Sequence, residues 1–203
     1  MSKAVINKVV RRIKGKGGNV VSVTDLLDIG TRVAVDQALS RLVKQGRIVR
    51  VQRGLYSQAR VSALLGRTIS PQLDELVRAW AKKNGLKIIP SGAMAANLLG
   101  LSTQVPAKII YYTNGRSKTL KLGSHSIKFL NRGPKTMDVK GRVSPLVFQS
   151  LRYFGKDGVA PQIVSRLSRL LSPKDKKELQ RNIPLAAAWM KPILEKIIAG
   201  GRR

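Results

Sequence analysis

The sequence predicts an α+β fold with two domains, over residues 1–60 and 61–203. In the first domain, residues 22–57 combine a helical apolar pattern with a short basic segment rich in β-branched residues, which indicates a helix followed by a β-hairpin. In the second, strand-like segments at about residues 86–130 precede helix-like segments at about residues 144–198. An apolar content of 43% is sufficient for two cores of this size.

One helix organises the first domain, and it is expected between Thr31 and Gly46. With about 100° between successive residues, one side of this helix carries the apolar residues Val35, Ala38, Leu39, Leu42 and Val43. The roughly opposite side carries Val33, Gln37, Ser40, Arg41 and Lys44. Gly46 is expected to end the helix. The pattern therefore predicts a helix that packs through one face and presents mainly polar side chains on the other.

A β-hairpin is expected directly after this helix. Residues 47–51, with the sequence Arg-Ile-Val-Arg-Val, combine arginine with the β-branched residues that strands favour. Residues 52–54, with the sequence Gln-Arg-Gly, supply a turn that leads into Leu55 and Tyr56. The sequence thus predicts a short hairpin with a basic surface.

Shorter elements are expected before the central helix. Residues 3–14 place aliphatic side chains at helical spacing, and residues 19–21 suit a short strand that joins the hairpin. Ser22 and Asp25 have the spacing of a capping box, which predicts a short helix through Ile29. Helix, glycine turn, helix and basic hairpin together predict a winged helix-turn-helix.

The second domain is expected to combine a small antiparallel sheet with helices. The predicted strands occupy residues 86–89, 108–112, 118–122 and 126–130, with turns marked by Asn114-Gly115 and Gly123. The predicted helices occupy residues 70–84, 91–99, 144–154, 161–171 and 184–198, and another helix opens at Ser172-Pro173-Lys174-Asp175. Ser70 and Pro71 are expected to form the cap and first turn of the first of these helices.

Charge is the strongest compositional signal. The chain has 39 Lys and Arg residues and 10 Asp and Glu residues, which gives a net charge of +29. Residues 1–60 hold 13 basic and 3 acidic side chains, so the excess is present in both domains. An excess of this size favours binding to a polyanion such as nucleic acid.

No pattern in the sequence indicates catalysis, a metal site or a cofactor. The acidic residues of the second domain are mostly isolated, and His125, the only histidine, lies in a predicted solvated turn. Cysteine is absent, which excludes thiol chemistry. No signal peptide or membrane-spanning run is recognisable, so we expect a cytoplasmic protein without enzyme activity and without a membrane partner.

The first domain offers the side chains that read DNA. Arginine and lysine bind guanine, glutamine binds adenine, and small apolar groups contact the thymine methyl, while arginines beside the helix and in the hairpin reach phosphates or the minor groove. The predicted DNA-binding residues are Arg32, Val33, Gln37, Ser40, Arg41, Lys44, Arg47, Arg50 and Arg53.

A second basic surface is expected on the sheet of the second domain. It comprises Lys108, Arg116, Lys118, Lys121, Lys128 and Arg132. Tyr111, Tyr112 and Phe129 lie between these residues in the sequence, either as platforms for RNA bases or as core residues. This surface would extend the DNA footprint, bind RNA or meet an acidic partner.

Three segments together resemble a known family. They are residues 39–56 (Leu-Ser-Arg-Leu-Val-Lys-Gln-Gly-Arg-Ile-Val-Arg-Val-Gln-Arg-Gly-Leu-Tyr), residues 109–118 (Ile-Ile-Tyr-Tyr-Thr-Asn-Gly-Arg-Ser-Lys) and residues 127–134 (Ile-Lys-Phe-Leu-Asn-Arg-Gly-Pro). In this order the chain resembles the AbiEi family of abortive-infection antitoxins. The resemblance implies that the N-terminal domain represses its own operon at inverted repeats in double-stranded DNA, where a dimer is possible. It also implies that the C-terminal domain counters a cognate nucleotidyltransferase toxin, directly or indirectly.

Two alternative functions are consistent with the same sequence features. A winged-helix transcriptional regulator without a toxin partner would differ only in its gene neighbourhood. An RNA-binding or ribosome-associated protein is favoured by the charge of +29 but disfavoured by the well-patterned polar face of residues 31–46.

Overall fold

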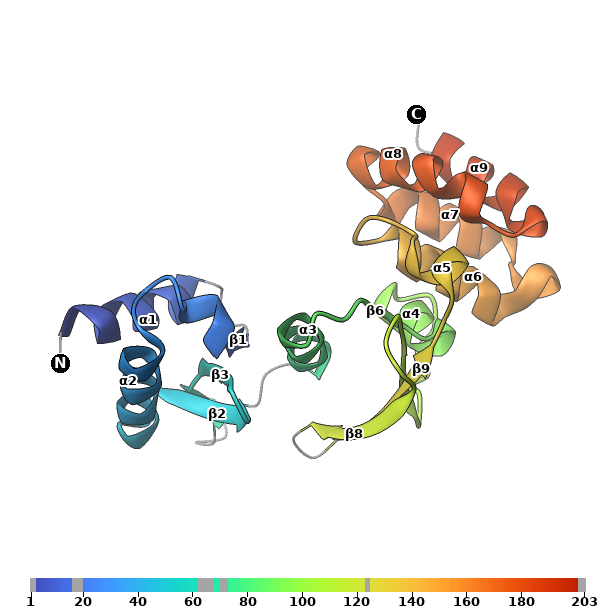
Figure 1. Cartoon of the computed structure of the whole chain (residues 1–203). Coiled ribbons are helices and arrows are strands. Elements are labelled where there is room, and N and C mark those ends of the chain that lie inside the picture. The colour runs from blue at the N-terminus through green and yellow to red at the C-terminus, as the bar shows by residue number, and fades with distance from the viewer. Residues whose placement is uncertain (1–2, 16–19, 62–67, 70–72, 123–124, 201–203) are drawn as a thin grey trace. The chain divides into compact units, whose positions relative to one another are not determined.

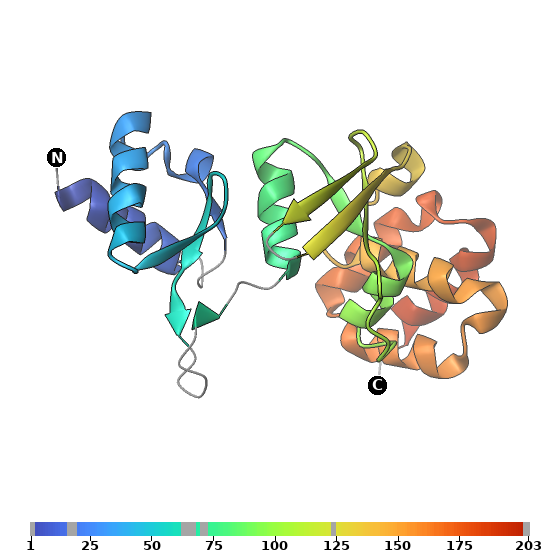
Figure 2. The same cartoon turned by 90° about the horizontal axis from the view of Figure 1, so that it is seen from below.

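The computed structural model describes residues 3–15, 20–61, 68–69, 73–122 and 125–200, and these form an α+β fold with helices and small sheets (Figures 1 and 2). The chain divides into a first unit, Met1–Leu86 with Lys121–His125, and a second unit, Lys87–Leu120 with Ser126–Arg203. The expected boundary after residue 60 therefore differs from this division, because helix α3 (Leu73–Lys83) belongs to the first unit. A pair of two-residue strands, β4 (Arg60–Val61) and β5 (Thr68–Ile69), precedes α3.

The core of the first unit is formed between helices α1 (Lys3–Gly15) and α2 (Arg32–Lys44). From α1, Val9 and Ile13 are buried, and from α2 the buried residues are Val35, Ala38, Leu39 and Leu42. The predicted apolar face of α2 is thus confirmed, with Val43 half-buried at its margin. The helix begins after Thr31, whose side chain accepts a hydrogen bond from the Ala34 amide, and ends before Gly46, which has a φ of 65°.

A three-stranded antiparallel sheet flanks α2, with strand order β1 (Val21–Ser22), β3 (Leu55–Gln58), β2 (Ile48–Gln52). The predicted hairpin of β2 and β3 is confirmed, and it lies beside α2 in both views (Figures 1 and 2). Its register shifts between Arg50 and Gln52, where a bulge increases the local twist. Gly54, with a φ of 73°, completes the turn.

The capping box of Ser22 and Asp25 is confirmed, but the helix that it opens is shorter than predicted. This helix is a single 3-10 turn, η1 (Val23–Leu26), and does not reach Ile29. The Asp25 carbonyl accepts from Arg12 Nη1 at 3.0 Å, and the Ile29 amide bonds to the Leu26 carbonyl instead. Arg12 also binds Asp28, and this hydrogen bond and charge attraction raise the pKa of the Arg12 guanidinium. A contact from α1 therefore ends the turn.

Helix α3 buries Leu76, Val77 and Trp80, and Leu73 at its start is half-buried. Gly85, with a φ of 64°, follows its last turn. The predicted cap at Ser70-Pro71 lies outside the described residues.

A four-stranded sheet lies mainly in the second unit, with strand order β6 (Ile88–Pro90), β7 (Ile109–Thr113), β9 (His125–Asn131), β8 (Lys118–Leu122). Strands β6 and β7 are antiparallel, but β7 and β9 are parallel, so the predicted purely antiparallel sheet is wrong. Between β6 and β7 lies helix α4 (Gly92–Leu98), with Ser91 at its N-cap position.

The segment after β7 explains this difference. A two-residue hairpin turn at Asn114-Gly115 would need a positive φ at both central residues, and Gly115 does not have one. Instead, Asn131 Nδ2 donates to the Gly115 carbonyl at 2.8 Å, and the Asn131 amide donates to Ser117 Oγ at 2.9 Å. These bonds hold the segment against the end of β9, and β9 lies between β7 and β8.

The last third of the chain is helical, as predicted. Its helices are α5 (Pro134–Met137), α6 (Ser144–Gly158), α7 (Pro161–Leu170), α8 (Pro173–Asn182), η2 (Ile183–Leu185), η3 (Ala188–Met190) and α9 (Lys191–Ala199). The capping box of Ser172 and Asp175 is confirmed. The single helix predicted over residues 184–198 is wrong. Inside such a helix Pro192 would leave one carbonyl without its amide partner, and the regular helix begins only at Lys191.

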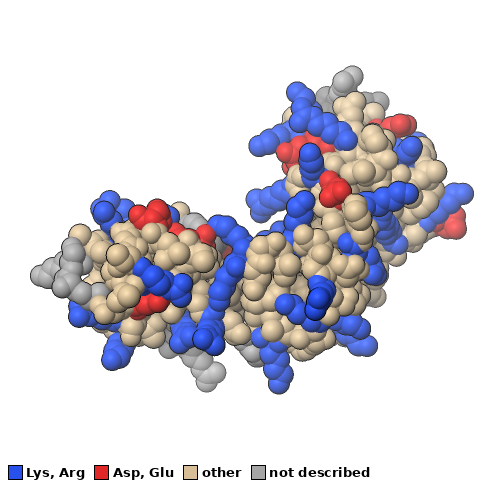
Figure 3. Space-filling view, viewed as in Figure 1, with Lys and Arg blue, Asp and Glu red and all other residues tan. Residues whose placement is uncertain are grey.

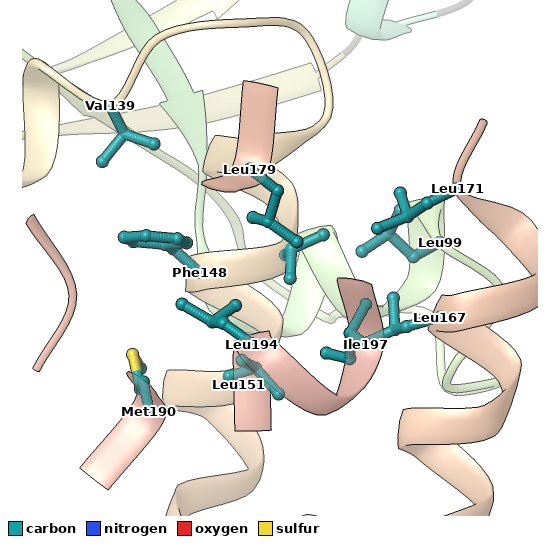
Figure 4. Close-up of a cluster of buried hydrophobic side chains, with 11 residues drawn as sticks. Leu99, Val139, Phe148, Leu151, Leu167, Leu171, Leu179, Met190, Leu194 and Ile197 are labelled. Atoms are coloured by element: carbon teal, nitrogen blue, oxygen red, sulfur yellow. The ribbon is translucent and has the colours of Figure 1, made fainter. Parts of the chain in front are cut away.

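Helices α6, α7, α8 and α9 share a core in the second unit. Figure 4 shows Phe148 and Leu151 of α6 beside Leu194 and Ile197 of α9, with Leu167 of α7 adjoining them. Leu99, after α4, belongs to the same cluster. The helical part and the segment of α4 therefore fold as one body.

A buried amide ties α8 to the segment before α6. Asn182 is 4% exposed, and its side chain donates to the Lys140 carbonyl and accepts from the Lys140 amide, both at 2.9 Å. The same amide nitrogen donates to the Glu178 carbonyl at 2.8 Å.

Replacement of Asn182 by alanine should lower the free energy of unfolding by about 1–3 kcal/mol, because it removes the side-chain partners of the partly buried Lys140 amide and carbonyl. Urea denaturation measures this loss. Gln180→Ala, at an exposed position of the same helix, is the control. Equal losses in the two variants would contradict a structural role for the Asn182 amide.

Candidate nucleic-acid interface

A groove of about 570 Å³ lies between α2 and the hairpin within the first unit. It is lined by Val23, Thr24, Arg32, Asp36, Ser40, Val43, Lys44, Arg50, Arg53, Gly54, Tyr56 and Lys83. Its basic side chains come from three elements: α2, the hairpin and α3. Five cations and one carboxylate therefore surround one concave surface, which favours an anionic ligand.

Helix α2 supplies one wall of the groove. Arg32, Asp36, Ser40 and Lys44 follow each other at four-residue steps, so they form one line along the helix. This line is exposed, because the buried stripe of α2 faces the core on the other side. The packing of α2 therefore determines which of its side chains reach the groove.

The first cation of this line already has a partner. Arg32 Nε donates to Asp36 Oδ2 at 2.8 Å, and the two side chains are 60% and 47% exposed. Pairs this exposed are held weakly, so an incoming phosphate is able to replace the carboxylate. Asp36 was not among the predicted residues, although its position four residues after Arg32 in the sequence is a signal for such a pair.

The hairpin supplies the opposite wall. Arg50 lies opposite Tyr56 in the strand register, and Arg53 lies in the turn. Both arginines are exposed, whereas Tyr56 is half-buried against the core. The bulge after Arg50 bends β2 just before the turn that carries Arg53.

The nine predicted residues divide into two groups. Arg32, Ser40, Lys44, Arg50 and Arg53 line the groove, whereas Val33, Gln37, Arg41 and Arg47 are exposed outside it. Val33, Gln37 and Arg41 form a second line on α2, about 100° around the helix from the first. Val33 is 66% exposed, which is high for an aliphatic side chain. The two lines together make one continuous exposed face.

All six residues of the second basic surface are exposed: Lys108, Arg116, Lys118, Lys121, Lys128 and Arg132. Lys and Arg side chains greatly outnumber Asp and Glu side chains on the visible surfaces of both units (Figure 3). The sequence has eleven basic residues and no acidic residue between Glu75 and Asp138. This acid-free stretch was a signal in the sequence that the prediction of individual residues did not use.

The aromatic residues of the sheet have different environments. Tyr111 and Phe129 are buried, with ring centroids 6.2 Å apart, which confirms the interpretation that they are core residues. The Arg132 guanidinium lies over the half-buried Tyr112 ring, 4.7 Å from its centroid. Within the described residues, the sheet therefore presents no open row of aromatic rings.

His125, at the start of β9, is exposed. Among the described residues, no three His, Asp or Glu side chains form a group able to hold a metal ion. Within the same part of the chain, no helix has the length and apolarity needed to cross a membrane.

Residues 5–179 match a protein family described as a family of unknown function, DUF6088. The chain belongs to this family. The crystal structure of the RV2827C protein from Mycobacterium tuberculosis is similar to this DUF6088 protein, with 16% sequence identity and a TM-score of 0.46. The similarity covers 98% of this chain and 77% of that chain. No curated protein matches the chain.

Replacement of Asp36 by asparagine should strengthen the binding of a polyanion in the groove about two- to fivefold at low salt, because it releases Arg32 and removes the carboxylate; duplex DNA serves as the polyanion in the test. Fluorescence anisotropy with a labelled duplex measures the change. Asp157→Asn alters the net charge equally at an exposed position of the second unit. An equal gain in this control would attribute the effect to net charge alone.

Proposed function

We propose that this protein is a DNA-binding regulator whose first unit is a winged helix-turn-helix. The observation that carries the proposal is the exposed face of α2, bordered by the cationic groove that α2 shares with the hairpin. In this arrangement α2 is the recognition helix, and the hairpin of β2 and β3 is the wing.

The two lines of side chains on α2 suit different parts of a duplex. Gln37 and Arg41, on the outer line, carry the groups that bond adenine and guanine edges in the major groove. Val33 is exposed on the same line. Contact with a thymine methyl would remove its apolar surface from water, which is favourable. The outer line is therefore proposed to read bases.

The groove is proposed to hold the DNA backbone. Arg50 and Arg53 lie across it from Lys44, so one strand of phosphates between them would meet cations from both walls. Such contacts bind every sequence equally and set the register in which α2 meets the bases. Inverted repeats would then be read by two copies of the chain, one on each half-site.

Autorepression and antitoxin activity are proposed on the resemblance to the AbiEi family. In this proposal the first unit binds the upstream DNA, and the second unit counters a cognate nucleotidyltransferase toxin, directly or indirectly. The second unit has its own core around Phe148 and Leu194, which supports a separate task for it. A winged regulator without a toxin partner would have the same first unit, and a toxin gene beside this one would distinguish the two.

An RNA-binding function has less support. Sheets that bind RNA stack bases on exposed aromatic side chains. Here Tyr111 and Phe129 are in the core, and Arg132 covers Tyr112.

Arg41→Ala in the full chain should weaken binding to the upstream DNA by about 1–3 kcal/mol and leave binding to unrelated DNA nearly unchanged, because a base contact is lost only on the operator. Mobility shifts on the two DNAs measure both affinities. Arg53→Ala is the comparison, because it should weaken both complexes and reduce the salt slope by about one unit. If intact protein fails to bind its upstream DNA, the repressor proposal is wrong.

A variant with alanine at Val33, Gln37 and Arg41 should lose repression of the operon and still rescue growth when the neighbouring toxin is expressed. The three positions are exposed on the first unit, so the fold of the second unit should not change. A promoter reporter and a growth assay in the same strain give the two readouts. Loss of rescue together with repression would contradict the proposed division of tasks.

A further inference from the structure

We infer that helix α3 belongs to the DNA interface and that Lys83 at its C-terminal end is a binding residue for the phosphate backbone. The inference rests on the proposed DNA binding and goes beyond it, because α3 follows the hairpin and lies outside the segment that carries the winged-helix pattern. The contacts of two consecutive lysines support it.

Lys83 is tied to the tip of the hairpin. Its Nζ donates to the Arg53 carbonyl at 2.7 Å, and its side chain lines the same groove as Arg50 and Lys44. An ammonium group has three N–H donors, and a backbone carbonyl takes one of them without cancelling the charge. Lys83 thus brings a full positive charge, and further donors, to the groove.

The Lys83 ammonium lies close to the hairpin turn. A Cβ atom at Gly54 would lie 2.8 Å from Lys83 Nζ, closer than ordinary van der Waals contact. Gly54 also has a φ of 73°, which disfavours any other residue. The turn needs this glycine for its positive φ, and the end of the flexible Lys83 side chain lies beside it at the hairpin tip.

The preceding lysine pairs with a carboxylate of the η1 cap. Lys82 Nζ lies 2.5 Å from Asp25 Oδ1, and the Asp25 side chain is 13% exposed. Asp25 also accepts from the Ser22 amide in the capping box, so this carboxylate is held rigidly. The Lys82 side chain is 68% exposed, but it lies against this held carboxylate, which offsets its charge. Lys83 meets a carbonyl instead and keeps its charge for a ligand.

The ligand is identified by the composition of the groove. Lys83 joins Arg32, Lys44, Arg50 and Arg53, and Asp36 is the carboxylate that faces them. Side chains from α2, the wing and α3 thus surround one path, which suits a continuous chain of phosphates. Phosphates are the same in every DNA sequence. A phosphate contact from Lys83 should therefore add the same binding free energy on all of them.

The test compares Lys83→Gln with Lys82→Gln in the full chain. Both variants remove one positive charge from adjacent exposed positions of α3, so their net charges are equal. Lys83→Gln should reduce the slope of log affinity against log salt by about one unit on the operator and on unrelated DNA. Lys82→Gln should leave the slope unchanged, and Lys83→Arg, which retains the charge, should restore it.

The outcomes separate this inference from the proposed function. If the intact protein binds duplex DNA and Arg50→Gln lowers the slope but Lys83→Gln does not, α3 lies outside the interface and the inference is wrong. Equal reductions in Lys82→Gln and Lys83→Gln would also overturn it, because net charge would then explain both. If the intact protein binds no duplex DNA, the proposed function and the inference fail together. Thermal melts verify that the variants fold alike.

Discussion

The packing of one stripe of α2 against α1 determines which side chains of α2 are presented to solvent. Val35, Ala38, Leu39 and Leu42 are fully buried, so rotation of the helix by one residue would move the whole stripe away from Val9 and Ile13. The opposite face is therefore fixed relative to the hairpin mainly by apolar packing, together with a backbone bond from the Arg47 amide to the Leu42 carbonyl. A hydrophobic constraint thus sets the geometry of an electrostatic surface.

That surface combines cations with few carboxylates, and three of these, Asp25, Asp28 and Asp36, have clearly different positions. Asp28 holds α1 through Arg12, and Asp25 holds both the η1 cap and Lys82. Asp36 is different, because it faces the groove and pairs with Arg32 on an exposed turn of α2. The first two carboxylates organise the fold, whereas the third reduces the attraction of the groove for anions.

The sequence predicts those features that depend on neighbouring residues. The faces of α2 follow from helical periodicity, and the capping boxes at Ser22 and Ser172 follow from spacing over three residues. Three other features depend on partners far along the chain: the parallel pairing of β7 with β9, the early end of η1 caused by Arg12, and the place of Lys83 beside Arg53. No local pattern specifies such contacts, because they form between elements whose order in space the sequence does not state.

The strand order of the four-stranded sheet has a consequence for association between molecules. Because β9 lies inside the sheet, β8 becomes an edge strand, and it carries the exposed Lys118 and Lys121. The other edge, β6, is three residues long and ends in Pro90, which lacks an amide hydrogen. Short or charged edges prevent strands of separate molecules from pairing. The lysines of β8 therefore protect a small sheet from edge-to-edge aggregation, and their loss would threaten solubility whatever the surface binds.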